Sequence, residues 1–287
     1  MNVATRAARS VRCDLPRQFL LITVSTAILA LTATISHAET SLRNAPLPSS
    51  TSGWLVGLGG GVIASPDYRG ASTYRVRPIP AIAVRYGDDF ALSGLEASYT
   101  GIRAGSWRAG AQARFRFGQE EADNRVALSG LGDVDPSVEL GGFVGYGQGP
   151  VTLKASFAHD VAGGHGGQVA TLSAAYTTQL HRSSAGPVLF SVGPSVTWAS
   201  AKFNRAYYGV DIRQSAGSGL AYYRPGSGLE SAGLSMNLIA PLSRRITFIA
   251  NAGYDRLVAK AADSPRVRER GSPSQATIGA FLTYRLF

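Results

Sequence analysis

One segment alternates strictly between apolar and polar side chains. Residues 107–118 read W-R-A-G-A-Q-A-R-F-R-F-G, with an apolar residue at every odd position and a polar residue or glycine at every even one. Because successive side chains of a strand point to opposite faces, this pattern predicts a β-strand with one apolar and one polar face. The apolar face suits either a soluble sandwich or a membrane barrel, and the length suits a tilted bilayer crossing.

The N-terminus has the features of a secretory signal peptide. Four arginines precede the apolar run 19–35, and the small residues Ser36 and Ala38 follow it. This order predicts export and cleavage after Ala38. The alternative, a transmembrane anchor, needs about 20 apolar residues. The only cysteine, Cys13, lies before the apolar run, so the mature chain has no thiol for a disulfide or a metal site.

The predicted organisation has three parts. Residues 1–38 form the signal peptide, the Pro- and Ser-rich residues 39–52 form a periplasmic N-terminal tail, and residues 53–287 form the barrel. The mature chain has no apolar run of 18 residues, which excludes a membrane-spanning helix at the level of the sequence. Its length fits one large all-β domain.

Alternating segments recur along the mature chain. They predict eleven strands, near residues 53–64, 74–86, 89–101, 107–118, 137–147, 150–160, 168–181, 187–200, 229–240, 245–258 and 275–287. Single-chain bacterial barrels have even strand numbers. We therefore expect one error, in the glycine- and proline-bearing stretch before residue 106, and either ten or twelve strands, with twelve favoured. Alternation is weaker around Pro78 and Pro80, because proline cannot donate to a strand ladder and suits only a rim or a bulge.

The connections differ in length in a way that is typical of outer-membrane barrels. Residues 147–150, 182–187 and 241–245 are short connections, whereas 119–136, 201–228 and 259–274 are long and polar. Short turns in the periplasm and long loops outside the cell are the usual arrangement. The predicted fold is therefore an all-β, transmembrane, antiparallel up-and-down β-barrel in the cell outer membrane.

The charge does not indicate a nucleic-acid-binding protein. The formal net charge is +10, and removal of residues 1–38, with four Arg and one Asp, leaves +7. Lysine and arginine are scattered singly, and no nucleic-acid-binding motif is present. We therefore assign the charge to the lumen, the loops and the rims, where arginine can also meet lipopolysaccharide phosphates. The expected partners are outer-membrane lipid and lipopolysaccharide.

The C-terminus has the pattern of an assembly signal. The last nine residues alternate between apolar and polar and end on an aromatic residue. This pattern resembles the signal that the barrel assembly machinery reads, and it predicts that machinery as a partner, with the signal carried by Gly279, Phe281, Tyr284 and Phe287.

The polar face of residues 107–118 predicts a set of lumen-facing side chains, namely Arg108, Gln112, Arg114 and Arg116. In an open lumen these arginines would favour anions. In a narrow barrel they would instead pair with lumen carboxylates such as Glu96 or Glu139, because small barrels are filled by side chains. The second interpretation is preferred.

No convincing catalytic, cofactor or metal site is predicted. The best cluster consists of His159 beside Asp160, with His165 nearby, and neighbouring residues of a strand point to opposite faces. A general base must be oriented by a second group and reach a nucleophile, so Asp160 is poorly placed to orient His159. The glycine run 57–61 partly matches a nucleotide-binding loop, but a turn follows it in place of a helix. Such glycines more often allow curvature or close packing.

The chain resembles the family of the MltA-interacting protein and OmpV. The resemblance rests on several blocks in order along the mature chain, residues 57–61 with 65–70, 128–135, 207–210 with 218–222, and 261–265. It implies an outer-membrane barrel and, for the founding member, a scaffold between a lytic transglycosylase and a murein synthase. Members of one barrel family need not share partners.

Three classes of function remain open. The first is a non-enzymatic scaffold that binds peptidoglycan enzymes through the tail 39–52 and the basic turn formed by Ser243, Arg244 and Arg245. The second is a narrow passive channel for small solutes. The third is surface adhesion or an outer-membrane enzyme. The preferred prediction is the scaffold.

Overall fold

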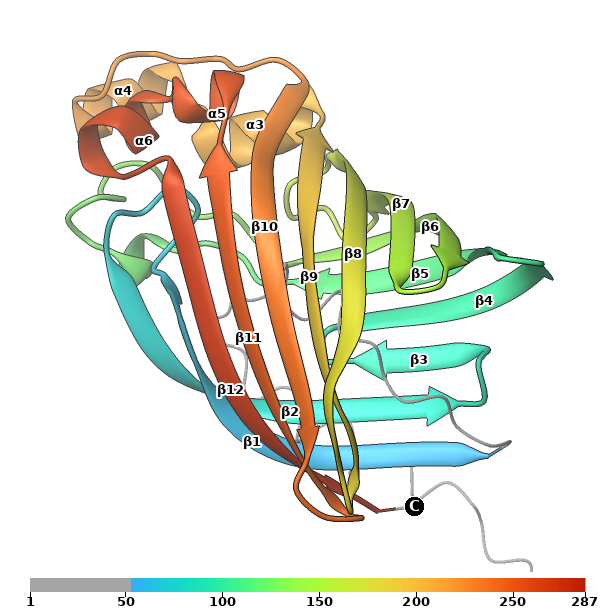
Figure 1. The fold of residues 1–287 in the computed structure, drawn as a ribbon. Helices are drawn as coiled ribbons and strands as arrows, with labels where there is room; N and C mark the ends of the chain where they lie inside the picture. The colour runs from blue at the N-terminus through green and yellow to red at the C-terminus, as the bar shows by residue number, and fades with distance from the viewer. Residues whose placement is uncertain (1–52, 287) are drawn as a thin grey trace, which may run out of the picture. The chain divides into compact units, whose positions relative to one another are not determined.

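Twelve antiparallel strands form a closed barrel (Figure 1). The computed structural model describes residues 53–286, so the predicted signal peptide, the tail 39–52 and Phe287 lie outside the described residues. Each strand pairs with its neighbours in sequence, and the last strand closes the barrel against the first. The strands are β1 Trp54–Pro66, β2 Tyr74–Tyr86, β3 Phe90–Ser93, β4 Glu96–Ala104, β5 Trp107–Arg116, β6 Ser137–Gln148, β7 Val151–Asp160, β8 Gln168–Ser183, β9 Gly186–Ala199, β10 Gly228–Pro241, β11 Ile246–Leu257 and β12 Ser274–Arg285.

The strand count confirms the preferred prediction of twelve and locates the expected error. The segment predicted as one strand over 89–101 is two strands, β3 and β4, which pair with each other. The turn between them contains Gly94 at a φ of 57°, a left-handed conformation that glycine adopts without a steric penalty. The turn at Gly94 therefore divides a segment that the pattern of apolar residues predicts as one continuous strand.

Helices lie at one end of the barrel (Figure 1), and the sequence analysis did not predict them. They are the short 3-10 helix η2 Glu121–Asp123 and the α-helices α3 Ala201–Tyr208, α4 Ile212–Ser218, α5 Ala259–Ala262 and α6 Pro265–Arg270. All of them fall within the long connections, so the predicted separation of long loops and short turns at opposite ends is found. We call the helical end the outer end and the short-turn end the inner end, following the usual orientation of such barrels.

Two glycines allow β1 and β12 to close the barrel. A Cβ atom on Gly59 would lie 1.9 Å from the carbonyl oxygen of Leu282, and one on Gly61 would lie 2.2 Å from that of Ala280. Any side chain at either position would overlap the neighbouring backbone. The glycine run therefore serves close strand packing, which is the structural interpretation that the sequence favoured over a nucleotide loop.

The strands carry an apolar exterior. Large apolar side chains are exposed along nearly every strand, among them Leu58, Val62, Val76, Ile82, Leu140, Val144, Leu153, Phe157, Leu172, Val196, Leu234, Ile278 and Leu282. So large an apolar surface suits lipid and not water. Two aromatic pairs, Trp54 with Tyr86 and Trp107 with Tyr146, have ring centroids 4.8 and 4.9 Å apart at the inner end. They match the aromatic girdle of an outer-membrane barrel.

The buried apolar core lies under the loops of the outer end. Phe203, Tyr207 and Tyr208 of α3 are almost fully buried, in a cluster with side chains from β8, β11, α5 and α6. A second cluster joins Tyr68 and Ala71 to apolar residues of the loops 117–136 and 209–227. Within residues 53–286, no helix has the length and apolar character needed to span a bilayer.

Candidate functional site

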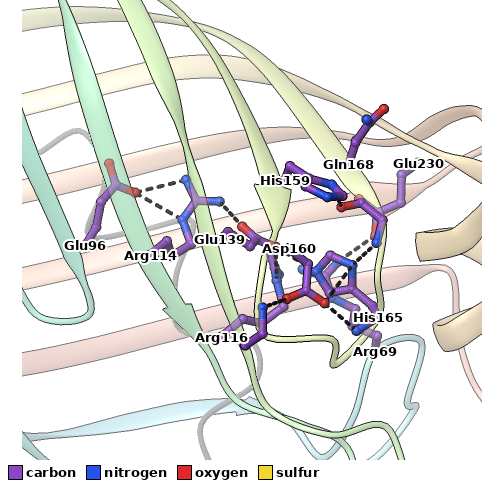
Figure 2. Close-up of polar contacts among 12 residues, drawn as sticks. Arg69, Glu96, Arg114, Arg116, Glu139, His159, Asp160, His165, Gln168 and Glu230 are labelled. Atoms are coloured by element: carbon purple, nitrogen blue, oxygen red, sulfur yellow. Dashed lines mark hydrogen bonds and ion pairs between the residues drawn. The ribbon is translucent and has the colours of Figure 1, made fainter.

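Charged side chains from opposite walls meet inside the outer half of the barrel. We call these side chains, with the hydroxyl of Tyr208, the lumen network, and Figure 2 labels most of them. The network comprises Arg69, Glu96, Arg114, Arg116, Glu139, Lys154, Asp160, His165, Tyr208 and Glu230. Several of these charges are fully removed from solvent. Such burial is tolerated only when each charge is paired and hydrogen-bonded.

Glu139 of β6 is the centre of the network. Its carboxylate accepts hydrogen bonds from Arg116 Nε at 2.8 Å and from Arg114 Nη1 at 3.2 Å. The Glu139 and Arg116 side chains are 0% and 1% exposed. Arg114 also contacts Glu96 at 3.0 Å, and Glu96 in turn contacts Lys154 at 3.2 Å. The pairing of lumen arginines with Glu96 and Glu139 that the sequence favoured is therefore present.

His165 joins Glu139 to the loop between β7 and β8. The backbone N–H of Gly167 donates to His165 Nδ1 at 3.0 Å, so Nδ1 carries no proton in this arrangement. His165 Nε2 then donates to Glu139 at 2.9 Å. Because both ring nitrogens are engaged, His165 holds the loop in place and is not free to act as a general base.

Asp160 shapes the same loop and does not orient His159. Its carboxylate accepts backbone N–H groups, at 2.8 Å from His165 and 2.7 Å from Gly166 (Figure 2). His159 is exposed on the opposite face of β7, and its Nδ1 lies 3.1 Å from the carbonyl oxygen of Gly167. The structure thus agrees with the strand-parity argument against a catalytic His159–Asp160 pair.

A second buried ion pair joins a loop arginine to β10. Arg69, from the loop between β1 and β2, contacts Glu230 of β10 at 2.5 Å. Burial disfavours the charged form of Arg69, but attraction to Glu230 outweighs it and raises the pKa of Arg69 above its ordinary value. The Tyr208 hydroxyl also donates to Glu230. Burial, and then the adjacent carboxylate, raise the pKa of Tyr208 well above the ordinary value.

The ring of Phe203 connects the two halves of the network. The guanidinium carbons of Arg69 and Arg116 lie 5.3 and 5.5 Å from its centroid, and the His165 ring lies 4.9 Å away, edge-on. Desolvated cation–π contacts of this kind are worth about 2 kcal/mol. Contacts therefore run without a break across the lumen, from β5 and β6 through α3 to β10.

The predicted lumen-facing residues divide into two groups. Gln112, Arg114 and Arg116 are buried, and two of them belong to the network. Arg108 is exposed near the inner end of β5, one residue after the start of the strand.

The predicted partner-binding and assembly residues lie at the inner end or on β12. Ser243, Arg244 and Arg245 are exposed in the turn between β10 and β11. Arg245 Nη1 donates to the Tyr284 hydroxyl at 2.8 Å. Of the C-terminal residues, Gly279, Phe281 and Tyr284 lie on β12.

The sequence did not predict several residues of the network or of the aromatic side chains beside it. Arg69 and Glu230 were not predicted as partners, because nothing in the sequence brings a loop arginine to a carboxylate far along the chain. Phe203 and Tyr207 lie in a segment that we predicted as a polar loop. Within residues 53–286, no group of three or more His, Cys, Asp or Glu side chains is arranged to hold a metal ion.

The chain is similar to known outer-membrane proteins in sequence and in fold. The Escherichia coli K12 protein named "Putative outer membrane protein YiaT" is 32% identical over 116 residues, which cover 40% of this chain and 45% of the relative. This chain thus matches less than half the length of that relative. Among solved structures, the NanC porin has 10% identity and a TM-score of 0.41, with 81% of this chain and 100% of that chain covered. An outer membrane channel from Pseudomonas putida F1 has 11% identity and a TM-score of 0.43, with 84% and 99% covered.

The family match spans the whole barrel except the start of β1 and the last residue. Residues 58–286 match the family described as MltA-interacting protein MipA. The sequence resemblance had indicated the same family from separate short blocks. The chain therefore belongs to the MltA-interacting protein MipA family and is a twelve-stranded β-barrel of the outer membrane.

Proposed function

We propose that this protein is a non-enzymatic outer-membrane platform that binds a lytic transglycosylase and a murein synthase at its inner end. The family name supports the first partner, since MltA is a lytic transglycosylase. The observation that carries the proposal is the lumen network. A lumen crossed by buried ion pairs and by α3 suits a structural anchor better than a pore.

The charges of the inner turns support a binding surface for an acidic partner. In the turn between β2 and β3, Asp88 and Asp89 neutralise Arg85 and Arg103, at 2.9 and 2.7 Å. The turn at 242–245 carries two arginines and no carboxylate. It therefore leaves positive charge at the inner surface.

Within that turn, the two arginines have different roles. The Arg245 guanidinium lies 6.0 Å from the Tyr284 ring centroid and donates to its hydroxyl, which fixes its position. Arg244 is exposed, and its side chain makes no hydrogen bond, ion pair or cation–π contact within residues 53–286. Arg244 is therefore the better candidate for direct contact with a partner, and Arg245 for holding the turn.

A short turn and a tail bury little area, so the affinity is expected to be weak. Small, transient interfaces bury less than about 1,200 Å², and we expect binding in the micromolar range. Screening between exposed charges acts over about 8 Å at physiological ionic strength, so binding should weaken as salt rises.

A pull-down from a periplasmic extract tests the proposal. The detergent-solubilised protein should retain a lytic transglycosylase or a murein synthase at low salt. Replacement of residues 39–52 and of Ser243–Arg244–Arg245 by Gly/Ser should abolish retention. Arg125→Ser, an exposed arginine at the outer end, is the matched control and should leave retention unchanged.

The second candidate is a narrow channel, and one observation favours it. Below the network, β9, β10 and β11 carry buried side chains that are polar but uncharged, among them Ser191, Asn237 and Asn251. Asn237 and Asn251 lie directly opposite each other in the ladder, and their amide groups have no partner within residues 53–286. Buried amide groups without a protein partner are usually hydrogen-bonded to water, which indicates water inside the barrel at this level. Steady conductance steps in a planar bilayer, together with no retained cell-wall enzyme, would replace the platform by the channel.

A further inference from the structure

We propose that a pocket at the outer end binds an anionic saccharide, a sugar carrying carboxylate or phosphate groups. The pocket has a volume of about 600 Å³. It lies among three connections, the loop 117–136, Gly164 of the loop 161–167 and the segment 205–224 that contains α4. This size is typical of small-molecule sites. The proposal concerns the end opposite the inner turns and does not depend on the proposed platform function.

Three arginines line this pocket without a carboxylate partner among the described residues. Arg205, Arg213 and Arg224 are exposed and form no ion pair within residues 53–286. Arg205 donates only from Nε, to the carbonyl oxygen of Ala201 at 3.0 Å, which leaves its two terminal nitrogens available. Other arginines of the outer half contact carboxylates, among them Arg69, Arg75 and Arg116. Three guanidinium groups without such a contact around one pocket therefore give it a positive lining. Guanidinium groups bind carboxylates and phosphates in a bidentate manner.

The carboxylates of the pocket do not cancel this charge. Asp133 accepts the backbone N–H of Glu121 at 2.7 Å, and Asp211 accepts that of Gln214 at 2.8 Å. Both carboxylates are thus directed into their own loops. Three positive groups against two negative ones, with the negative ones already hydrogen-bonded, favour an anionic ligand.

The remaining lining suits a sugar ring better than a bare inorganic ion. Tyr222 is 54% exposed and Ile212 is 77% exposed at the pocket. An exposed aromatic face packs against the C–H face of a sugar, and its hydroxyl can bond to sugar hydroxyls. A site for phosphate alone would not need such apolar surface.

The pocket floor is held in place before any ligand binds. Val210 is fully buried, and its backbone exchanges two hydrogen bonds of 2.8 Å with that of Tyr223. The Tyr223 hydroxyl donates to the carbonyl oxygen of Lys260 at 2.8 Å. A preorganised site binds with a smaller loss of conformational entropy. The arginines therefore project from a fixed frame and not from a loose loop.

Calorimetry on the mature protein in detergent micelles tests the proposal. The probes are trigalacturonate, its neutral counterpart maltotriose, and rough lipopolysaccharide as the membrane-borne source of the same chemistry. Trigalacturonate should bind and maltotriose should not. Each change, Arg213→Gln or Arg224→Gln, should weaken binding about tenfold, the effect of losing one charged hydrogen bond. Arg125→Gln, an exposed outer arginine that does not line the pocket, should change it less than about twofold.

The outcomes separate the two sources of ligand. Binding of trigalacturonate that depends on Arg213 and Arg224 supports a free acidic saccharide. Binding of lipopolysaccharide alone, with the same dependence, supports the proposal with a lipid headgroup as ligand. Equal binding of trigalacturonate and maltotriose, equal losses in the pocket variants and in Arg125→Gln, or no binding of either anionic probe would overturn it.

Discussion

Replacing Glu139 by glutamine should strongly destabilise the barrel. Glu139 is fully buried and receives Arg116 at 2.8 Å, Arg114 at 3.2 Å and His165 at 2.9 Å. Glutamine keeps the shape of the Glu139 side chain but removes its negative charge. The buried guanidinium groups of Arg114 and Arg116 then lose the carboxylate that balances their positive charge. Loss of one partner from a buried pair costs about 3–5 kcal/mol. We expect a decrease of that size in the free energy of unfolding.

The chain offers a matched control for this change in Glu96→Gln. Glu96 also contacts Arg114, at 3.0 Å, but its side chain is 18% exposed, so water replaces part of the lost interaction. Solvent-exposed pairs contribute roughly 0–1 kcal/mol, so we expect a loss for Glu96→Gln between that range and the loss for Glu139→Gln. Urea unfolding in lipid vesicles, followed by tryptophan fluorescence, measures both variants under the same conditions.

A double-mutant cycle then isolates the pair at the centre of the network. Arg116→Met in the Glu139→Gln background removes the stranded charge, so the double variant should be more stable than the sum of the single losses predicts. Coupling between contacting residues is about 0.5–3 kcal/mol. Equal losses for Glu139→Gln and Glu96→Gln, or additive losses in the cycle, would refute the argument that burial makes Glu139 essential.

Three further predictions concern other parts of the molecule. Ala111→Arg, on the exposed face halfway along β5, should cost about 2–4 kcal/mol in vesicles, whereas Ala111→Leu should be nearly neutral. Deletion of residues 284–287 removes the last rungs that close β12 against β1 and should abolish the heat-modifiable band in outer-membrane fractions. Burial opposes ionisation of Asp67, but hydrogen bonds from Thr73 and Arg75 outweigh it and keep its pKa below 3.8. Its contribution to stability should therefore be complete above pH 3.8, disappear as the pH falls below that value, and be absent in Asp67→Asn.

The sequence predicted the barrel well because its signal repeats. The alternation of apolar and polar residues is a local property of the sequence, so it predicted β5 and the other long strands. The same two-residue period placed the neighbouring residues His159 and Asp160 on opposite faces of β7. The division of 89–101 into β3 and β4 depends on one left-handed glycine, Gly94, and a pattern of apolar residues does not report backbone dihedrals. The sequence nevertheless located the error through the even-strand rule.

The structure of the outer end was harder to predict because it depends on contacts between residues that are far apart in the sequence. The helix α4 has a capping box formed by Asp211 and Gln214, and this spacing is a sequence signal for the start of a helix. Helix α3 is fixed by burial of Phe203 against two guanidinium groups, and nothing near it in sequence indicates those partners. The ion pair between Arg69 and Glu230 joins residues that are 161 positions apart.

The two ends of the barrel are too far apart to influence each other through charge. Strand β10 has 14 residues, and at about 3.3 Å per residue and a tilt of about 40° it separates the ends by roughly 35 Å. That is several times the screening length of about 8 Å at physiological ionic strength. Helix α3 nevertheless reaches both regions of the outer half, since Arg205 lines the pocket and Phe203 packs in the lumen network. A ligand at Arg205 could affect the inner turns only by moving Phe203 away from Arg69 and Arg116, and their burial opposes that movement. Saccharide binding outside and enzyme binding inside should therefore be independent of each other in the intact barrel.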